Sequence, residues 1–521
     1  MAGWKELAYR GAVGSRDPDV LIIGSGPNGL VAACRLAMRG LSVVVLEAHP
    51  RRPGGALGSQ ECTLPGFVHD VGAGFFPFGR SSPALRELEL ERRGVVWHNA
   101  EIESCHPGQD GSVASLAREQ GLGAWPLCDS PRDAERWRRL CEWYASAEGP
   151  ILDALFSPLP SLRPALRLGL RNGGRLARLM LSSAGGLGRR LFESEAARRV
   201  VPSLALHVDV GPEDAFGSGL GALLGLAATT GGFAVPRGGA QSITNALITL
   251  LEERGGKLVL GARVEKVLVS ERTAVGVRLA DGQELRARDA VMADTSAPSL
   301  LLDLVEQQWL PRRVLRRMRR FPQGWGTFKV DFALSEPVPW SVESARRSAV
   351  VHVGEDVADL VRFTREVRDG KLPEAPYLVV GQHSLVDPTR APEGRHTLYV
   401  YTHTPSVLAE GYDAVREGFA DRITERIERL APGFGGAVLE RALHAPSDLQ
   451  RENANLRGGD LGGGSARWTN QLVLRPIFPY FRYRLPVSRL YLCSAYTHPG
   501  TGVHGMCGWN AAGVLMGDIG A

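Results

Sequence analysis

A glycine-rich turn between two short apolar segments, close to the start of the chain, constrains the fold more than any other feature. Residues 20–23 are apolar and partly β-branched, which predicts a buried strand. Residues 30–39 have helical character, and residues 42–46 predict a second buried strand. The turn before the helix has the spacing G-x-G-x-x-G, formed by Gly24, Gly26 and Gly29. This order predicts a β-α-β unit that binds a dinucleotide.

Each part of this unit has a physical role in holding a dinucleotide. Gly24 permits the tight turn, Gly26 lets the backbone approach the pyrophosphate, and Gly29 lets the helix pack closely on the strand. The helix N-terminus presents a partial positive charge to the phosphates. Glu47, at the end of the second strand, is placed to accept hydrogen bonds from ribose hydroxyls and would repel a 2′-phosphate. The unit alone is compatible with NAD and with FAD.

The composition indicates a soluble, globular chain with more than one domain. At 521 residues the chain is too long for one simple core, so two or three domains are expected. The formal net charge of +5 is small for this length and does not favour nucleic-acid binding. Five lysines stand among 61 basic residues, so arginine-rich stretches reflect a general bias and are discounted.

Cysteine usage and the apolar stretches favour a cytoplasmic protein. The seven cysteines include no C-x-x-C pair, which favours reduced thiols over a zinc site or a disulfide framework, and no metal is expected. Residues 1–17 lack the apolar core of a signal peptide and predict a loose arm. Residues 216–235 carry no charge, but they are mostly Gly, Ala and Thr. They therefore predict a buried helix rather than a membrane span.

The rest of the chain divides into alternating segments of an α/β fold. We expect a discontinuous cofactor-binding domain from residues 18–80, 235–297 and 488–521, and a substrate or lid domain from residues 81–234 and 298–487. Residues 81–211 predict a largely helical region. The final segment predicts a strand, a glycine-rich turn and a helix beginning near residue 503 or 504.

The middle segment of the cofactor domain predicts a helix over residues 241–254 followed by strands. We expect these strands to extend one sheet, with strands at residues 257–260, 263–269, 275–279 and 289–292.

One helical stretch in the substrate region combines arginine with leucine at four-residue intervals, which stacks each set along one side of a helix. Such a surface could contact an anionic membrane peripherally. The arginine bias and the nearby glycines favour a solvated face instead. The residues are Arg163, Arg167, Arg171 and Arg175, beside Leu162, Leu166 and Leu170.

Five motifs in matching order carry a family resemblance over nearly the whole chain. They are GSGPNG with Glu47, the Gly54-Gly55 pair, PRGGAQSI, GWGTFKVDFALSEPVPW and LYLCSAYTHPGTGVHGMCGWNAA. The chain resembles the phytoene dehydrogenase-like flavoproteins. These include carotene desaturases, flavoprotein carotene ketolases and the pyridine nucleotide-disulfide oxidoreductase domain-containing protein 2 group. The resemblance implies FAD, a Rossmann-like FAD domain, and a substrate domain with a mixed sheet and helices, as in amine oxidases.

The resemblance also implies which residues contact FAD. Ala56 departs from the family pattern, in which arginine commonly follows the glycine pair, so the backbone and Arg51 or Arg52 are expected to hold the pyrophosphate instead. The full expected set is Gly24, Gly26, Pro27, Asn28 and Gly29 at the pyrophosphate, Glu47 at the ribose, Gly54, Gly55 and Ala56 at the ribityl side, Val264 at the adenine, Ala293 and Thr295 at a strand end, Ser494 near the phosphate or ribityl chain, and Gly502 and Val503 at the flavin pyrimidine.

Three side chains are candidates for the chemistry. The alternation of a strand puts Lys329 and Asp331 on one face, and the resemblance to amine oxidases implies that Lys329 holds a water at the flavin. The alternative is an exposed ion pair on a sheet face, which contributes little. His504 could serve as an acid or base, or as a structural hydrogen-bonding group.

Together these features predict an FAD-dependent oxidoreductase. The expected reaction is removal of hydride from an apolar small molecule, such as a polyene, an isoprenoid or a polycyclic compound, with flavin N5 as acceptor. Oxygen or another acceptor would then reoxidise the flavin. The alternatives are a flavin-dependent isomerase or ketolase, and a flavin-bearing scaffold without turnover. The sequence does not decide the oligomeric state.

Overall fold

The computed structural model describes residues 17–118, 123 and 126–521, so most of the expected N-terminal arm lies outside the described residues. A five-stranded parallel sheet has the order β19-β13-β1-β2-β9. Its strands come from three distant segments of the chain, which confirms a discontinuous Rossmann-like fold. They are β1 (Val20–Ile23), β2 (Val43–Leu46), β9 (Lys257–Val259), β13 (Ala290–Ala293) and β19 (Leu490–Leu492).

Both faces of this sheet are covered, as its continuously apolar strands require. One face packs on three helices, α2 (Pro27–Ala37), α10 (Gln241–Glu253) and α18 (Met506–Ile519). The other face packs on a separate three-stranded sheet and on the helical segments that follow β13. This small sheet contains β10 (Val264–Ser270), β11 (Thr273–Leu279) and β12 (Glu284–Arg286). The expectation of a single extended sheet was therefore wrong, because β10 and β11 pair with each other and not with β9 or β13.

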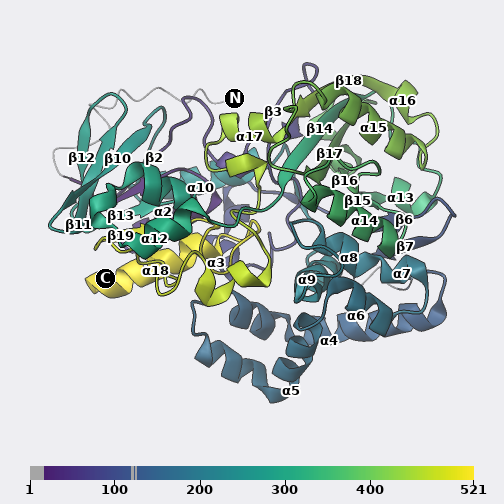
Figure 1. Ribbon diagram of the computed structural model, residues 1–521, viewed down its shortest axis with the longest axis horizontal. Coiled ribbons are helices and arrows are strands. Elements are labelled where there is room, and N and C mark those ends of the chain that lie inside the picture. The colour runs from purple at the N-terminus through teal and green to yellow at the C-terminus, as the bar shows by residue number, and fades with distance from the viewer. Residues whose placement is uncertain (1–16, 119–122, 124–125) are drawn as a thin grey trace.

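A second, seven-stranded mixed sheet lies beside the first body in Figure 1 and has the order β18-β14-β17-β16-β15-β6-β7. The expectation that residues 81–211 are largely helical missed two of its strands, β6 and β7; β6 pairs with β15, more than two hundred residues away in the chain. The members are β6 (Ile102–Pro107), β7 (Val113–Leu116), β14 (Gly326–Leu334), β15 (Ser348–Val353), β16 (Leu378–Gly381), β17 (His396–Thr404) and β18 (Val438–His444).

A helical layer lies below the second sheet in Figure 1. It comprises α4 (Pro131–Phe156), α5 (Leu162–Met180), α6 (Ala184–Leu191), α7 (Glu195–Arg198), α8 (Val200–Ala205) and α9 (Gly217–Thr230). Most residues of α9 are buried, which confirms the expected buried helix. None of the described helices combines the length and the apolar character needed to cross a membrane.

Further α-helices and short strands connect these layers. The helices are α3 (Pro83–Leu88), α11 (Ala297–Ser299), α12 (Arg312–Arg319), α13 (Glu343–Arg346), α14 (Val357–Arg368), α15 (Arg416–Glu428), α16 (Phe434–Ala437) and α17 (Pro446–Glu452). The strands are β3 (Ser59–Gln60), β4 (His69–Asp70), β5 (Trp97–His98) and β8 (Val235–Pro236).

Candidate active site

The first glycine turn packs against the end of a neighbouring strand. The Gly29 N–H donates a hydrogen bond to Asp294 Oδ2 at 2.8 Å. A Cβ atom on Gly29 would lie 2.3 Å from the Gly24 carbonyl oxygen, and one on Gly26 would lie 2.5 Å from Asp294 Oδ2. Gly26 at the N-cap of α2 has no side chain that could cap the helix, and the first-turn N–H of Gly29 is bonded by Asp294. This close backbone packing is compatible with the predicted pyrophosphate contact, which stays a prediction.

Asp294 is a site residue that sequence reasoning missed. It directly follows β13, between Ala293 and Thr295, which were both predicted. Burial raises the pKa of the Asp294 carboxyl to about 7, although the Gly29 N–H acts in the opposite direction. An acid directly after an apolar parallel strand was the available signal, because such strand ends meet ligands in α/β sheets.

Glu47 is held at the same turn by three hydrogen bonds. Its Oε2 accepts the Ser25 N–H at 2.9 Å and the Ser25 hydroxyl at 2.6 Å. Its Oε1 accepts the His49 N–H at 2.7 Å. These contacts hold the carboxylate beside the glycine turn, and its contact with a ribose stays a prediction.

Two further segments converge on the first turn. A Cβ atom on Gly55 would lie 3.4 Å from Gly26 Cα, so the second glycine pair runs alongside the first turn. A Cβ atom on Gly508 would lie 1.9 Å from the Asn28 carbonyl oxygen, so α18 packs directly on the start of α2. Three glycine-containing segments thus approach one another through backbone atoms, as an extended dinucleotide requires. The residues present fit FAD.

The remaining predicted FAD contacts are less tightly defined. The Arg52 guanidinium forms hydrogen bonds with Gln60 and Glu452 and thus already has partners within the chain. Ser494 is buried and accepts the Tyr496 N–H. The other positions are Ala56, which accepts the Ala73 N–H, Val264 at the start of β10, buried Thr295, exposed Gly502 and half-buried Val503. Their roles towards FAD stay predictions.

His504 supports the start of the last helix. α18 begins at Met506, later than the expected residue 503 or 504, because Gly505 adopts a left-handed conformation with φ of 68°. His504 Nδ1 accepts the Met506 N–H at 3.0 Å. Burial lowers the pKa of His504 to about 4, and its Nε2 has no partner among the described residues. The hydrogen bond with Met506 corresponds to the structural role, one of the two roles that the sequence left open for His504. A catalytic role stays a prediction.

Lys329 and Asp331 lie on one face of β14 and form a buried ion pair. Their side chains are 2% and 1% exposed, so the alternative of an exposed surface pair was wrong. The Lys329 ammonium also lies 4.6 Å from the centre of the Tyr399 ring on the adjacent strand β17. Because the Lys329 ammonium is excluded from water and paired with Asp331, its position is fixed.

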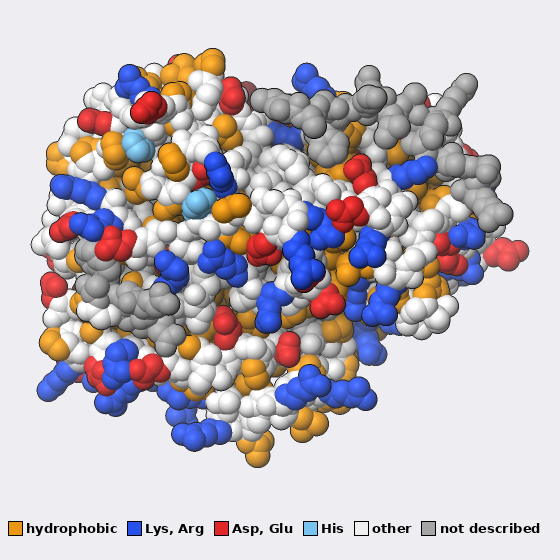
Figure 2. Space-filling view, turned by 180° about the vertical axis from the view of Figure 1, so that it is seen from behind, with side chains coloured by type: hydrophobic (Ala, Val, Ile, Leu, Met, Phe, Trp, Pro, Cys, Tyr) orange, Lys and Arg blue, Asp and Glu red, His pale blue; other side chains and the backbone are white. Residues whose placement is uncertain are grey.

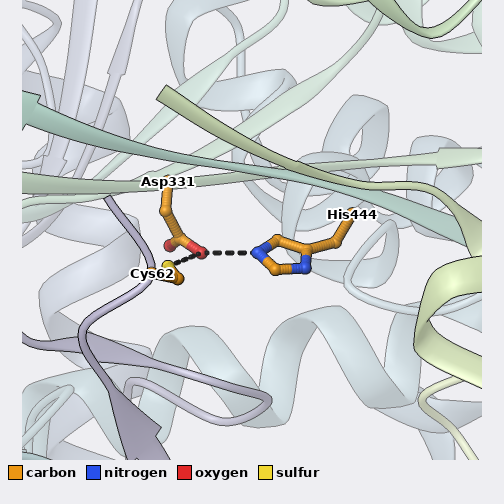
Figure 3. Close-up of side chains that lie close together, drawn as sticks. All are labelled: Cys62, Asp331 and His444. Carbon is orange, nitrogen blue, oxygen red and sulfur yellow. Dashed lines mark hydrogen bonds and ion pairs between the residues drawn. The ribbon is translucent and has the colours of Figure 1, made fainter. Parts of the chain in front are cut away.

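Further polar side chains converge on Asp331 (Figure 3). The Cys62 thiol contacts Asp331 Oδ2 at 3.5 Å, and His444 Nε2 lies 3.3 Å from the same oxygen. His69 Nδ1 lies 3.5 Å from Asp331 Oδ1. Burial alone would raise the pKa of Asp331, but the Lys329 charge and the neighbouring histidines hold it well below its usual value. Asp331 Oδ2 therefore accepts hydrogen bonds from Lys329 and Cys62, whereas Oδ1 has no hydrogen-bond partner among the described residues.

Cys62, Asp331 and His444 are residue types that bind transition metals. The Lys329 ammonium donates to the same Asp331 oxygen, however, and so supplies the positive charge itself. Burial raises the pKa of the Cys62 thiol to about 12, which keeps it protonated. We therefore assign no metal to this cluster.

The polar cluster is linked to the turn that precedes Phe75. The Tyr399 hydroxyl donates to the Gly72 carbonyl at 2.5 Å, and His383 Nε2 lies 3.0 Å from the Gly74 carbonyl oxygen. The His69-Asp70 pair of β4 was not recognised, although two adjacent buried polar residues in a short strand are an unusual pattern.

Buried histidines around the site predict acid sensitivity. Burial lowers the pKa of five of them from the usual 6.5 to about 4, namely His69, His383, His403, His498 and His504. Between these two pH values the unfolded chain takes up protons that the folded chain excludes. The free energy of unfolding should therefore fall as the pH falls, by up to about 1.4 kcal/mol per pH unit for each histidine.

Urea unfolding at about pH 8 and about pH 5 tests this expectation. Equal stability at the two pH values would contradict it.

Comparisons with known proteins agree with this geometry. The sequence profile of the family "Flavin containing amine oxidoreductase" matches residues 28–514. The chain is 30% identical to the Mus musculus protein "Pyridine nucleotide-disulfide oxidoreductase domain-containing protein 2", over 99% of this chain and 96% of that protein. It is 25% identical to "Phytoene desaturase (lycopene-forming)" of Pseudescherichia vulneris, over 93% and 96%.

A solved structure shows the same fold. The crystal structure of an oxidoreductase from Methanosarcina mazei superposes with a TM-score of 0.64 at 17% identity, and covers 96% of this chain and 99% of that chain. The residues that match the family profile include the second glycine pair, the buried lysine strand and most of the last helix. The chain therefore belongs to the flavin-containing amine oxidoreductase family and is an FAD-dependent oxidoreductase.

Proposed function

We propose that this enzyme dehydrogenates an apolar small molecule, such as a polyene or another isoprenoid. The observation that carries the proposal is a set of partly buried apolar side chains at the border of the core between the helical layer and the seven-stranded sheet, one of which, Phe75, directly follows the Gly72–Gly74 turn. The set includes Phe75, Leu220, Leu223, Leu224, Trp325 and Tyr401. The relative that forms lycopene from phytoene supports an apolar substrate of this kind.

Several aromatic side chains from the last part of the chain lie outside this region. Tyr483 is buried in the core under the parallel sheet, and its hydroxyl donates to the His498 carbonyl. Trp509 packs beneath the Arg35 guanidinium. Tyr480 packs against the core between the parallel sheet and the three-stranded sheet. These aromatic residues do not gather around one space, because each belongs to a different packing layer. Trp325, in contrast, borders the proposed substrate region.

The proposed roles of the protein groups follow from their positions. FAD, when bound, supplies a ring that accepts a hydride. The protein orients the apolar substrate, excludes water and holds positive charge near the reacting atoms. Lys329 provides that charge, since Asp331 and the Tyr399 ring fix its ammonium on one face of β14. Tyr399 also connects this face to the Gly72–Gly74 turn through its hydrogen bond to the Gly72 carbonyl. We propose oxygen or another small acceptor as the final oxidant.

Anaerobic mixing with apolar candidate substrates tests the proposal. We expect loss of the flavin absorbance with a true substrate and a product lighter by two hydrogens. Unchanged product mass would indicate an isomerase, and added oxygen would indicate a ketolase. A flavin that no apolar compound bleaches would contradict the proposal and favour a flavin-bearing scaffold.

Replacing Lys329 with methionine should slow the reaction of the chemically reduced enzyme with oxygen several-fold, because the variant lacks the fixed positive charge. Stopped-flow absorbance measures this rate without a known substrate. Lys266→Met is the matched control, because Lys266 of β10 pairs with Glu306 on a half-exposed surface. Equal rates for Lys329→Met and the wild type, at equal flavin content, would remove Lys329 from the mechanism.

A further inference from the structure

Helix α5 lies at the lower edge of the helical layer in Figure 1, and three of its leucine side chains are exposed. Leu162, Leu166 and Leu170 are 68%, 80% and 98% exposed. They follow one another at four-residue intervals, across a kink at Gly169. Leu176 and Leu179 of the same helix are buried against the helical layer. Within α5, Leu168, Leu176 and Leu179 are thus buried, while Leu162, Leu166 and Leu170 present large apolar side chains to solvent, which is uncommon in a monomeric protein.

The charge of this region is one-sided. Residues 154–192 contain seven arginines and no aspartate or glutamate. The whole chain has 56 acids among 521 residues, so about four would be expected in a stretch of this length. A general preference for arginine over lysine does not explain the absence of acids. Blue and orange side chains accordingly gather at the lower edge of Figure 2.

Helix α12 shows that basic charge by itself does not create such a surface. It carries five arginines within eight residues, but its apolar residues Val314 and Met318 are buried in the core. Helix α5 differs because its leucines and its arginines are exposed together. Exposed leucine with flanking arginine on one helix is the pattern of a segment that lies in the interface of an anionic bilayer.

We propose that α5 docks on an anionic lipid surface. The leucines enter the boundary between headgroups and acyl chains, and the arginines Arg163, Arg167 and Arg171 lie at the lipid phosphates. The sequence alone favoured a solvated face because of the arginine bias. The exposure of the leucines and the absence of acids reverse that preference.

The chain segment that leads into α5 packs against the turn that contains Gly502 and Val503. The Phe156 ring, at the end of α4, packs against the His504 ring with 4.9 Å between centres. Ser157 O lies 3.1 Å from His498 Nε2. Helix α5 begins five residues later, at Leu162. A lipid surface at α5 would thus suit an enzyme with an apolar substrate, but the inference itself does not rest on the proposed reaction.

Sedimentation with lipid vesicles tests the inference. We expect the wild-type protein to sediment with vesicles of phosphatidylcholine and phosphatidylglycerol, and to bind pure phosphatidylcholine vesicles much more weakly. Binding to the mixed vesicles should weaken as salt is added. Replacing Leu162, Leu166 and Leu170 together by serine should lower the partition coefficient at least about tenfold, because the apolar contribution to docking is lost.

The matched control removes charge from the other basic helix. Arg312→Gln, Arg316→Gln and Arg320→Gln together remove three exposed arginines of the α12 region and should leave vesicle binding unchanged. Flavin content, measured on every variant, shows that the fold is intact and also tests the proposed function separately. The inference would be overturned if the wild type stayed in the supernatant with anionic vesicles, as it would for a docking face that binds an acidic protein. Equal loss of binding in the α12 control would also overturn it.

Discussion

Replacing Gly29 with alanine should weaken FAD binding about a hundredfold. The new Cβ atom would lie 2.3 Å from the Gly24 carbonyl oxygen, which is backbone and cannot rotate away. It would also crowd Asp294, whose carboxylate accepts the Gly29 N–H. Relief of this overlap must shift the turn, at a cost of about 3 kcal/mol, and that cost corresponds to about two orders of magnitude in affinity.

Fluorescence titration of the apoprotein with FAD measures this effect. Gly517→Ala is the matched control, because Gly517 lies in α18 of the same body and a Cβ atom added there would meet no other atom within 4 Å. This control should bind FAD as the wild type does. A Gly29→Ala protein that binds FAD with wild-type affinity would show that the turn does not hold the cofactor.

Replacing Asp331 with asparagine should lower the free energy of unfolding by about 3 to 5 kcal/mol. Lys329 is 2% exposed, and Asp331 is its acidic partner among the described residues. The substitution would leave a buried ammonium with the Tyr399 ring and neutral groups around it. Removing one member of a buried ion pair is costly because the remaining charge is uncompensated.

A double-mutant cycle separates this effect from general damage to the core. The combined Lys329→Met and Asp331→Asn variant lacks both charges, so it should be about 2 kcal/mol more stable than Asp331→Asn alone. Urea unfolding of the four proteins gives the coupling energy. Additive losses in the double variant would mean that the two side chains do not act as a pair.

The first turn shows what could be predicted from local sequence. The strand, the glycines, the helix and Glu47 follow one another within about thirty residues, and each has a strong local preference. Asp294 contacts this turn from 265 residues away, so no local pattern connects it to Gly29. The residue could be suspected from its place at a strand end, but its partner could not be named.

The polar cluster shows the same limit. Alternation along β14 correctly placed Lys329 and Asp331 on one face. Whether that face is buried depends on β17, β18 and the segment around Cys62, which arrive from distant parts of the chain. In the same way, β6 and β7 became strands because β15 was available as a partner. Strand identity at these positions reflects tertiary pairing more than local propensity.

The flavin content of the purified protein tests the central claim most directly. The protein should be yellow, and the cofactor released by denaturation should co-elute with FAD in a ratio of one per chain. Apoprotein prepared by removing the cofactor should regain the same spectrum when FAD is added. A colourless protein that also fails to bind added FAD would contradict the account.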